Sequence, residues 1–116
     1  MKVSATPNLD MRCTGTQSIS FTEQHFINGL LGDMRIQADT VFANIAEVLA
    51  LGGATLDDVV KITAWLTDMD QYSGYNDARA AAFSNRLPAS ATVHSPRLVR
   101  DDLLVEVEAV AILGAA

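Results

Sequence analysis

The stretch GDMRIQADTVFANIAEVLALGG, residues 32–53, gives the clearest secondary-structure signal in the chain. Asp33 is a typical helix N-cap, and Gly52-Gly53 is a typical helix end. Apolar residues recur between these ends at the spacing of one helical face: Val41, Ile45, Val48 and Leu49. This pattern predicts an amphipathic helix with one buried side.

Extended segments flank this helix on both sides. Strands are expected at residues 2–6, 9–14, 59–67, 90–95 and 103–112, the first two joined as a hairpin by the turn signal Pro7-Asn8. A second helix is expected to follow a cap at Asp68 or Asp70 and to end near Phe83, and residues 14–31 are expected to be mostly loop. The order is ββαβαββ, which predicts one α+β domain over residues 1–116 with both helices on one face of a mixed sheet.

The other face of this sheet is expected to be apolar. Val60, Ile62, Ala64 and Leu66 alternate toward the helices. The opposite face is left with four large apolar residues: Trp65, Val59, Leu104 and Val110. Such a face is too apolar to stay in water, so we expect it to pack against copies of the same chain in a closed homo-oligomer, with ligand sites in the clefts between subunits.

Composition excludes several classes of partner. The chain has 8 Lys and Arg against 14 Asp and Glu, a net charge of −6 and no basic run, so neither nucleic acid nor an anionic membrane surface is expected as its main partner. The single cysteine, Cys13, excludes an intrachain disulfide. The N-terminal residues lack the apolar core of a signal peptide, and a cytoplasmic location is the simplest expectation.

No motif for a metal, phosphate or nucleotide is present, and we expect neither a metal nor an organic cofactor. Cys13 is interpreted as an inert apolar residue. His94 is either a titrating group or, more commonly for such a position, a polar residue on a partly solvent-exposed face. Arg97 and Arg100 flank a connector and are expected to be solvated.

Glu106 and Glu108 stand out because they interrupt an apolar strand, LLVEVEAVAI. A carboxylate in such a strand must be paired, hydrogen-bonded or protonated. One interpretation is a satisfied glutamate at an interface. The other is a general acid or base that positions water in a subunit cleft. The first interpretation weighs more for Glu108 than for Glu106.

The ordered motifs of residues 32–112 resemble the YjgF/RidA family of reactive-intermediate deaminases, also called the endoribonuclease L-PSP family. They are Q…NI…L, DVVK-T-WLTDM, YN…F, PA-x-x-TV and VEVEA, and the resemblance extends more weakly to about Lys2. It implies a chorismate-mutase-like fold and a homotrimer with a central β-barrel and three inter-subunit clefts. Deaminases of this family hydrolyse enamines or imines to a carbonyl product and ammonia without a cofactor.

The resemblance also implies roles for individual residues. Glu106 matches the water-positioning glutamate. Residues matching the substrate-binding positions are Thr14, Gly15, Asn76, Ser90 and Thr92. Ser90 departs from the family, because an arginine that clamps the substrate carboxylate is expected there, and a serine cannot replace a guanidinium fork. The N-terminal segment is also expected to be shorter than usual and to lack an aromatic cover for the site.

These matches leave three functions open. The first is a hydrolase acting on an enamine or imine of atypical structure, with Ser90 contacting a neutral group. Arg97 or Arg100 is a conceivable source of a relocated cation. The second is a non-catalytic trimer that binds a small metabolite or a protein. The third, an endoribonuclease or translation inhibitor, is disfavoured by the acidic charge balance.

Overall fold

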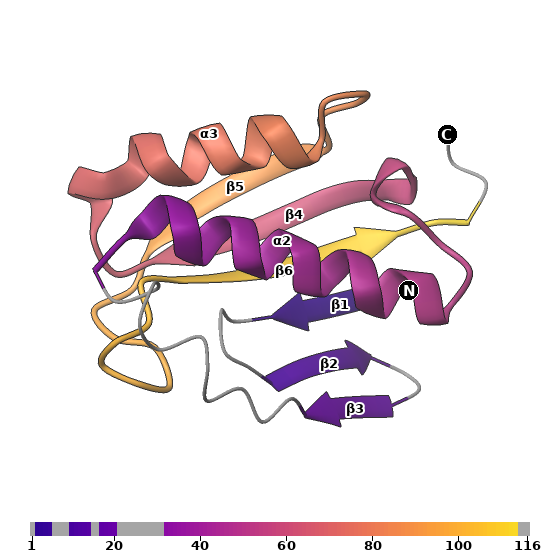
Figure 1. Cartoon of the computed structure of the whole chain (residues 1–116), viewed down its shortest axis with the longest axis horizontal. Coiled ribbons are helices and arrows are strands. Elements are labelled where there is room, and N and C mark those ends of the chain that lie inside the picture. Colours follow the sequence, from indigo (N-terminus) through magenta and orange to yellow (C-terminus); the bar gives the residue numbers. More distant parts are fainter. Residues whose placement is uncertain (1, 6–9, 15–16, 21–31, 114–116) are drawn as a thin grey trace.

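The computed structural model describes residues 2–5, 10–14, 17–20 and 32–113, and the side chains of residues 32–113. In this part of the chain two helices lie on one face of a six-stranded sheet (Figure 1). The strands are β1 (Lys2–Ala5), β2 (Asp10–Thr14), β3 (Gln17–Ser20), β4 (Val59–Leu66), β5 (Ala89–His94) and β6 (Val105–Ala111). The helices are α2 (Met34–Leu51) and α3 (Tyr72–Ala82), with 3-10 turns η1 (Leu56–Asp58) and η2 (Met69–Gln71). The architecture confirms the α+β prediction.

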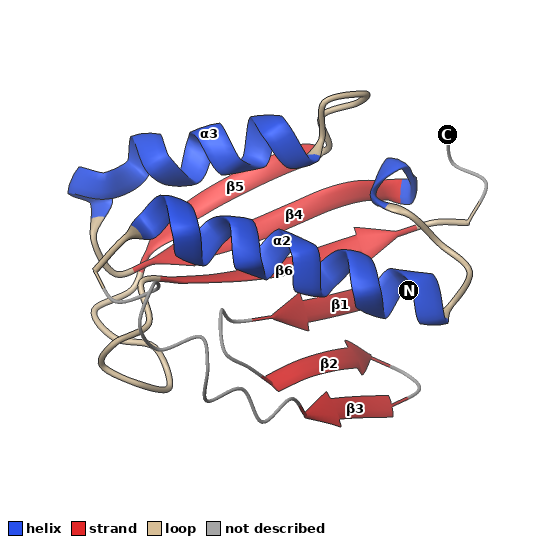
Figure 2. Ribbon diagram, viewed as in Figure 1, coloured by secondary structure: helices blue, strands red, loops and turns tan. Residues whose placement is uncertain are grey.

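The sheet is mixed, as expected, with the order β3-β2-β1-β6-β4-β5 (Figure 2). β4 and β5 are parallel, and every other described pair is antiparallel. β1 and β2 form the predicted hairpin, with Val3 opposite Cys13. Both helices lie on the same side of this sheet, and no described helix covers its second face, which is called the uncovered face below.

The sixth strand was not predicted. β3 pairs with β2, Met11 lying opposite Ile19, inside the segment that the sequence indicated as mostly loop. Its four residues, QSIS, are too few and too polar to produce a clear alternation. The strand exists because the edge of β2 supplies backbone partners, which single-sequence periodicity does not reveal.

Helix α2 follows its prediction closely. The Asp33 side chain accepts a hydrogen bond from the Ile36 amide at 3.0 Å, and Gly52 is the C-cap. Gly53 then adopts a φ of +79°, which glycine tolerates without strain. The whole predicted apolar stripe is buried: Val41, Ile45, Val48 and Leu49.

Helix α3 begins later than predicted. The Asp68 side chain accepts from the Asp70 amide at 3.0 Å, but this cap opens the 3-10 turn η2. The α-helix starts at Tyr72, after Gln71, without a side-chain cap. The Gln71 side chain instead accepts from the Met34 amide at 3.0 Å and so ties the starts of the two helices together.

The assignment of faces on β4 was wrong at its first two residues. The pairing of β4 with β6 shifts register between Val59 and Lys61, as a β-bulge does. Val59 is therefore 1% exposed in the core under the helices, whereas Val60, expected there, is half-buried. Leu104 also packs partly against the core. The uncovered face therefore lacks the predicted Val59, but Val93 joins Trp65 and Val110 there, since it lies beside Trp65 in the parallel ladder and is 44% exposed.

Gln37 is the buried polar residue that joins α2 to the start of β6. It is 1% exposed, its Nε2 donates to the Asp102 carbonyl at 3.0 Å, and its Oε1 accepts from the Leu104 amide at 2.8 Å. These bonds hold the end of the connector between β5 and β6 against the helix layer.

Replacing Gln37 by leucine is expected to lower the free energy of unfolding by about 2 kcal/mol, because two backbone groups lose their buried partner. Urea denaturation with a fixed m-value measures this loss. Arg35→Ala is the control on the same helix, since its ion pair with Asp39 is exposed and should contribute no more than about 0.5 kcal/mol. Equal midpoints for Gln37→Leu and the wild type would contradict the assigned role.

Candidate functional site

A polar cluster lies between α3 and the edge strand β5. α3 contributes Tyr75, Asn76 and Arg79, and β5 contributes Ser90 and Thr92. The cluster brings together three of the residues that the sequence singled out, Asn76, Ser90 and Thr92, with two that it did not.

The orientation of β5 follows from its register with β4. Ser90 lies beside Ile62, and Thr92 lies beside Ala64. Ile62 and Ala64 are fully buried beneath the helices. Neighbouring residues in a parallel ladder share a face, so the side chains of Ser90 and Thr92 also point to the helix side of the sheet.

Tyr75 lies at the centre of the cluster and is fully buried. Burial raises the pKa of its hydroxyl above the ordinary value of 10.0, and smaller effects from Ser90, Arg79 and Thr92 oppose the rise. Ser90 and Thr92 are therefore close to the hydroxyl, yet no described residue forms a well-aligned hydrogen bond with it. Native structures rarely leave such a group unsatisfied, so the cluster is a candidate ligand site.

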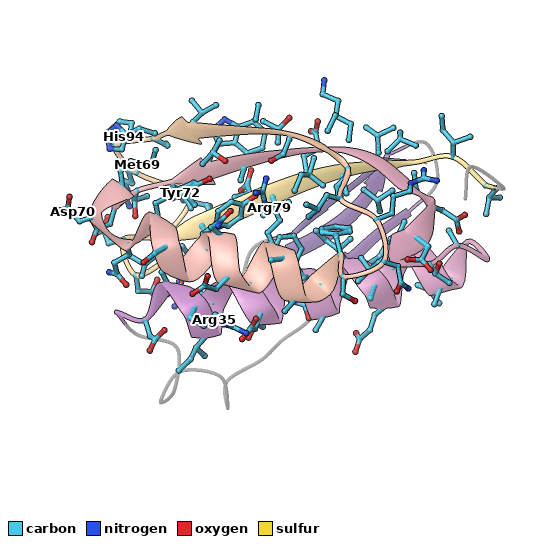
Figure 3. The ribbon with its side chains drawn as sticks, turned by 90° about the horizontal axis from the view of Figure 1, so that it is seen from above. Arg35, Met69, Asp70, Tyr72, Arg79 and His94 are labelled. Carbon is cyan, nitrogen blue, oxygen red and sulfur yellow. The ribbon has the colours of Figure 1, made fainter. Side chains whose placement is uncertain are left out.

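Arg79 extends from α3 into the space between the helix and the strands (Figure 3). Its Nη2 donates to the Asn76 Oδ1 at 2.7 Å, which fixes the plane of the guanidinium. Its Nε is buried and has no hydrogen-bond partner among the described residues. The cluster therefore contains a cation on the same side of β5 as Ser90.

Sequence reasoning missed Arg79. Arg79 lies in the run ARAAAF, residues 78–83, whose composition indicates only high helix propensity. The spacing held a usable signal, because Arg79 follows Tyr75 by four residues and Asn76 by three, which places all three on one helical face. Arg97 and Arg100, the two cations that were considered, pair instead with Asp101 and Asp102 within the connector.

Glu106 lies on the opposite side of the sheet. It pairs across the ladder with Trp65, and both alternate with residues buried under the helices. Glu108 lies on the same uncovered face, opposite Thr63. Both glutamates are half-buried and both have interaction partners. One chain therefore cannot present Glu106 and Ser90 to the same small molecule, because they point to different faces.

The other predicted site residues lie outside this cluster. Thr14 is the last residue of β2, opposite Lys2, but its side chain and all of Gly15 lie outside the described residues. His94 is exposed at the end of β5. A hollow of about 300 Å³ under the connector is lined by Thr67, Pro96, Arg97, Leu98, Arg100, Asp101 and Leu103, and so includes neither Ser90 nor Glu106.

In the described part of the chain, no group of three or more His, Cys, Asp or Glu side chains is placed to hold a metal ion. None of the described helices has the length and apolar character needed to cross a membrane.

The raised pKa of Tyr75 predicts a loss of stability in alkali. Above pH 10 the unfolded chain loses the Tyr75 proton while the folded chain keeps it, so the free energy of unfolding falls as the pH rises toward the folded-state pKa. Tyr75→Phe should reduce this fall and leave stability at pH 7 within about 1 kcal/mol of the wild type. Urea midpoints at pH 7 and about pH 11 test this. Tyr72→Phe is the control for loss of a tyrosine, and an identical alkaline fall in Tyr75→Phe would contradict the assignment.

Comparison with known proteins identifies the family. The profile described as Endoribonuclease L-PSP matches residues 18–113. A RutC family protein from Pyrococcus horikoshii is 38% identical over 80 residues, which cover 69% of this chain and 63% of the relative. The match thus spans less than two thirds of that relative's length.

Solved structures agree in fold. A member of the YjgF protein family from Neisseria meningitidis is 31% identical, with a TM-score of 0.68 over 78% of this chain and 74% of its own. A protein of unknown function from Pseudomonas aeruginosa is 25% identical, with a TM-score of 0.76 over 96% of this chain and 72% of its own. The chain therefore belongs to the Endoribonuclease L-PSP family, which includes the YjgF and RutC proteins and which its sequence motifs predicted.

Proposed function

We propose that this protein hydrolyses an enamine or imine intermediate to a carbonyl product and ammonia. The observation that carries the proposal is the position of Glu106, a half-buried carboxylate held by β6 on the uncovered face of the sheet. Deaminases that resemble this chain use a glutamate at this position to position water. The β ladder fixes its backbone, so the carboxylate is presented from a rigid element.

The reaction needs a positioned water and one group that moves a proton. An enamine first tautomerises to its imine. As water adds its oxygen to the imine carbon, Glu106 accepts a proton from the water, the C=N π electrons move to the nitrogen, and the nitrogen takes up a first proton to give a carbinolamine. The nitrogen then takes up a proton and leaves as ammonia, while the hydroxyl loses its proton and becomes the carbonyl. One water is consumed, and no electron acceptor or donor is required.

We place the active site between subunits of a chorismate-mutase-like homotrimer. The positions of Glu106 and Ser90 support this arrangement, since they point to opposite faces of one sheet. In a closed ring, the edge strand β5 of one copy can meet the uncovered face of the next. Such a cleft would combine the Ser90 side of one chain with the Glu106 side of its neighbour. The half-buried Trp65 and Val110 of that face would become covered.

The test is to generate 2-aminoacrylate in situ and to follow ammonia and keto-acid formation against a blank without protein. The wild type is expected to accelerate ammonia release in proportion to its concentration. The same assay with a neutral enamine, which lacks the carboxylate, asks how far the Ser90 substitution has changed substrate choice. Rates equal to the blank with both substrates would overturn the proposal.

A non-catalytic trimer that binds a metabolite is the second candidate, and Ser90 is the observation that favours it, because the usual carboxylate clamp is absent from β5. Ligand binding without ammonia release would support it. Endoribonuclease activity, which the family description names, fits less well with a net charge of −6.

A further inference from the structure

Arg79 is the exception among the arginines whose side chains the structure describes. Arg35, Arg97 and Arg100 each pair with an aspartate, at 2.9, 2.9 and 2.6 Å, and Arg86 also has an interaction partner. Arg79 has only the neutral Asn76 Oδ1 as a described acceptor. A partly buried guanidinium normally has an anion beside it, because its removal from water is costly.

The helix dipole does not account for this arrangement. Arg79 lies in the last turn of α3, where a cation is favourable. A cation that serves only the dipole can remain in water, as long basic side chains usually do. Arg79 instead turns under the helix toward the strands, with a buried Nε that lacks an acceptor. Its orientation is therefore explained by something between α3 and β5.

We propose that Arg79 binds the carboxylate of a small anionic ligand and replaces, from α3, the guanidinium expected on β5 at Ser90. The inference rests on the proposed function in one respect, namely that this ligand is the substrate. Under this proposal the site keeps a cation, and Ser90 need not contact a neutral group.

Three features make the replacement chemically consistent. The bond from Nη2 to Asn76 orients the guanidinium, so that less freedom is lost when a planar carboxylate binds it. Ser90 lies near the Tyr75 hydroxyl with a side chain much shorter than that of an arginine. A second guanidinium at Ser90 would also place two like charges close together, which is unfavourable.

The anchor keeps the substrate class that the family resemblance implies. The anchored group is a carboxylate, and the reacting carbon must lie close enough to it for the Glu106 side of a neighbouring subunit to deliver water. The fitting compounds are small 2-imino and 2-enamino acids, whose products are 2-oxo acids. Ser90 and Thr92 would offer hydroxyl groups on the same face.

The first experiment measures binding without catalysis. Pyruvate and its neutral analogue pyruvamide are titrated into the full-length protein by calorimetry. The wild type is expected to prefer pyruvate, and Arg79→Met is expected to weaken pyruvate binding by about 30-fold or more while pyruvamide changes little. Arg79→Lys should recover only part of the affinity, because an ammonium lacks the planar fork. Arg35→Met, which removes an exposed arginine of α2, is the matched control and should bind as the wild type does.

The second experiment moves the cation back to β5. In the double variant Arg79→Met with Ser90→Arg, pyruvate affinity should rise at least tenfold above that of Arg79→Met alone. This rescue also excludes misfolding as the cause of the single variant's defect. Wild-type affinity in Arg79→Met would overturn the inference, and so would equal affinities of the wild type for pyruvate and pyruvamide.

The two proposals can fail separately. Ammonia release that is insensitive to Arg79→Met would overturn the anchor and leave the hydrolase intact. Pyruvate binding that depends on Arg79, in a protein that releases no ammonia, would support the anchor and overturn the hydrolase.

Discussion

Glu106→Gln is expected to lower kcat for ammonia release by about 100-fold or more, with a much smaller change in KM. The amide keeps the size of the side chain and its place on β6, but it cannot accept the proton of the attacking water. If Arg79 holds the carboxylate on a different chain, substrate binding should survive the substitution. Steady-state kinetics with 2-aminoacrylate, together with pyruvate titration of the same variant, separate these two effects.

Glu108→Gln is the matched control, because it makes the same chemical change on the same strand and face, two residues further on. It should leave kcat within a few-fold of the wild type. Equal losses in both variants would indicate that the strand needs its negative charges for assembly, and would contradict a catalytic role specific to Glu106.

Mixed oligomers test whether the two sides of the site come from different chains. Arg79→Met and Glu106→Gln subunits are each inactive by this scheme. When equal amounts are assembled together, about one site in four should combine an intact Arg79 with an intact Glu106 from its neighbour. Recovery of about a quarter of the wild-type activity supports the inter-subunit site. No recovery in confirmed mixed oligomers would contradict the inter-subunit site, because it would mean that both residues act within one chain.

The sequence predicted those parts of the fold in which local pattern and packing agree. Helix α2 has its cap at Asp33, its apolar stripe and its terminal glycines in one continuous segment, and all three appear in the structure. The alternation of β6 around Glu106 is equally strict, from Val105 to Ala111. Such segments are predictable because each residue's preference supports the same element.

The errors arose where distant contacts decide the outcome. β3 is a strand only because β2 lies beside it. The bulge that turns Val59 into the core belongs to the pairing of β4 with β6, and an alternation count along one strand cannot detect it. Arg79 was missed for the same reason, because its role depends on the packing of α3 against β5. The same packing bears on the substrate prediction. Under the present proposal, Arg79 of α3 supplies the cation that was expected at Ser90 of β5.

The final prediction concerns assembly through the uncovered face. Val110 is half-buried there, near the centre of the sheet, where β6 lies between β1 and β4. Val110→Asp is expected to convert the proposed trimer into monomers at micromolar concentration. A ring moves the new carboxylate of each subunit out of water, where Lys61 of β4 lies opposite it, and the desolvation of each charge costs several kcal/mol. Every 1.4 kcal/mol lowers an association constant tenfold.

Light scattering coupled to gel filtration measures the change, and circular dichroism checks that the fold persists. Val99→Asp is the control, since this valine is 70% exposed on the connector, away from the sheet face, and should leave the oligomer intact. The monomer should also lose ammonia release while both Glu106 and Arg79 are present, because their distance across the sheet excludes a complete site in one chain. A monomer that retained full activity would show that one chain forms a complete active site by itself. The inter-subunit site would then be wrong.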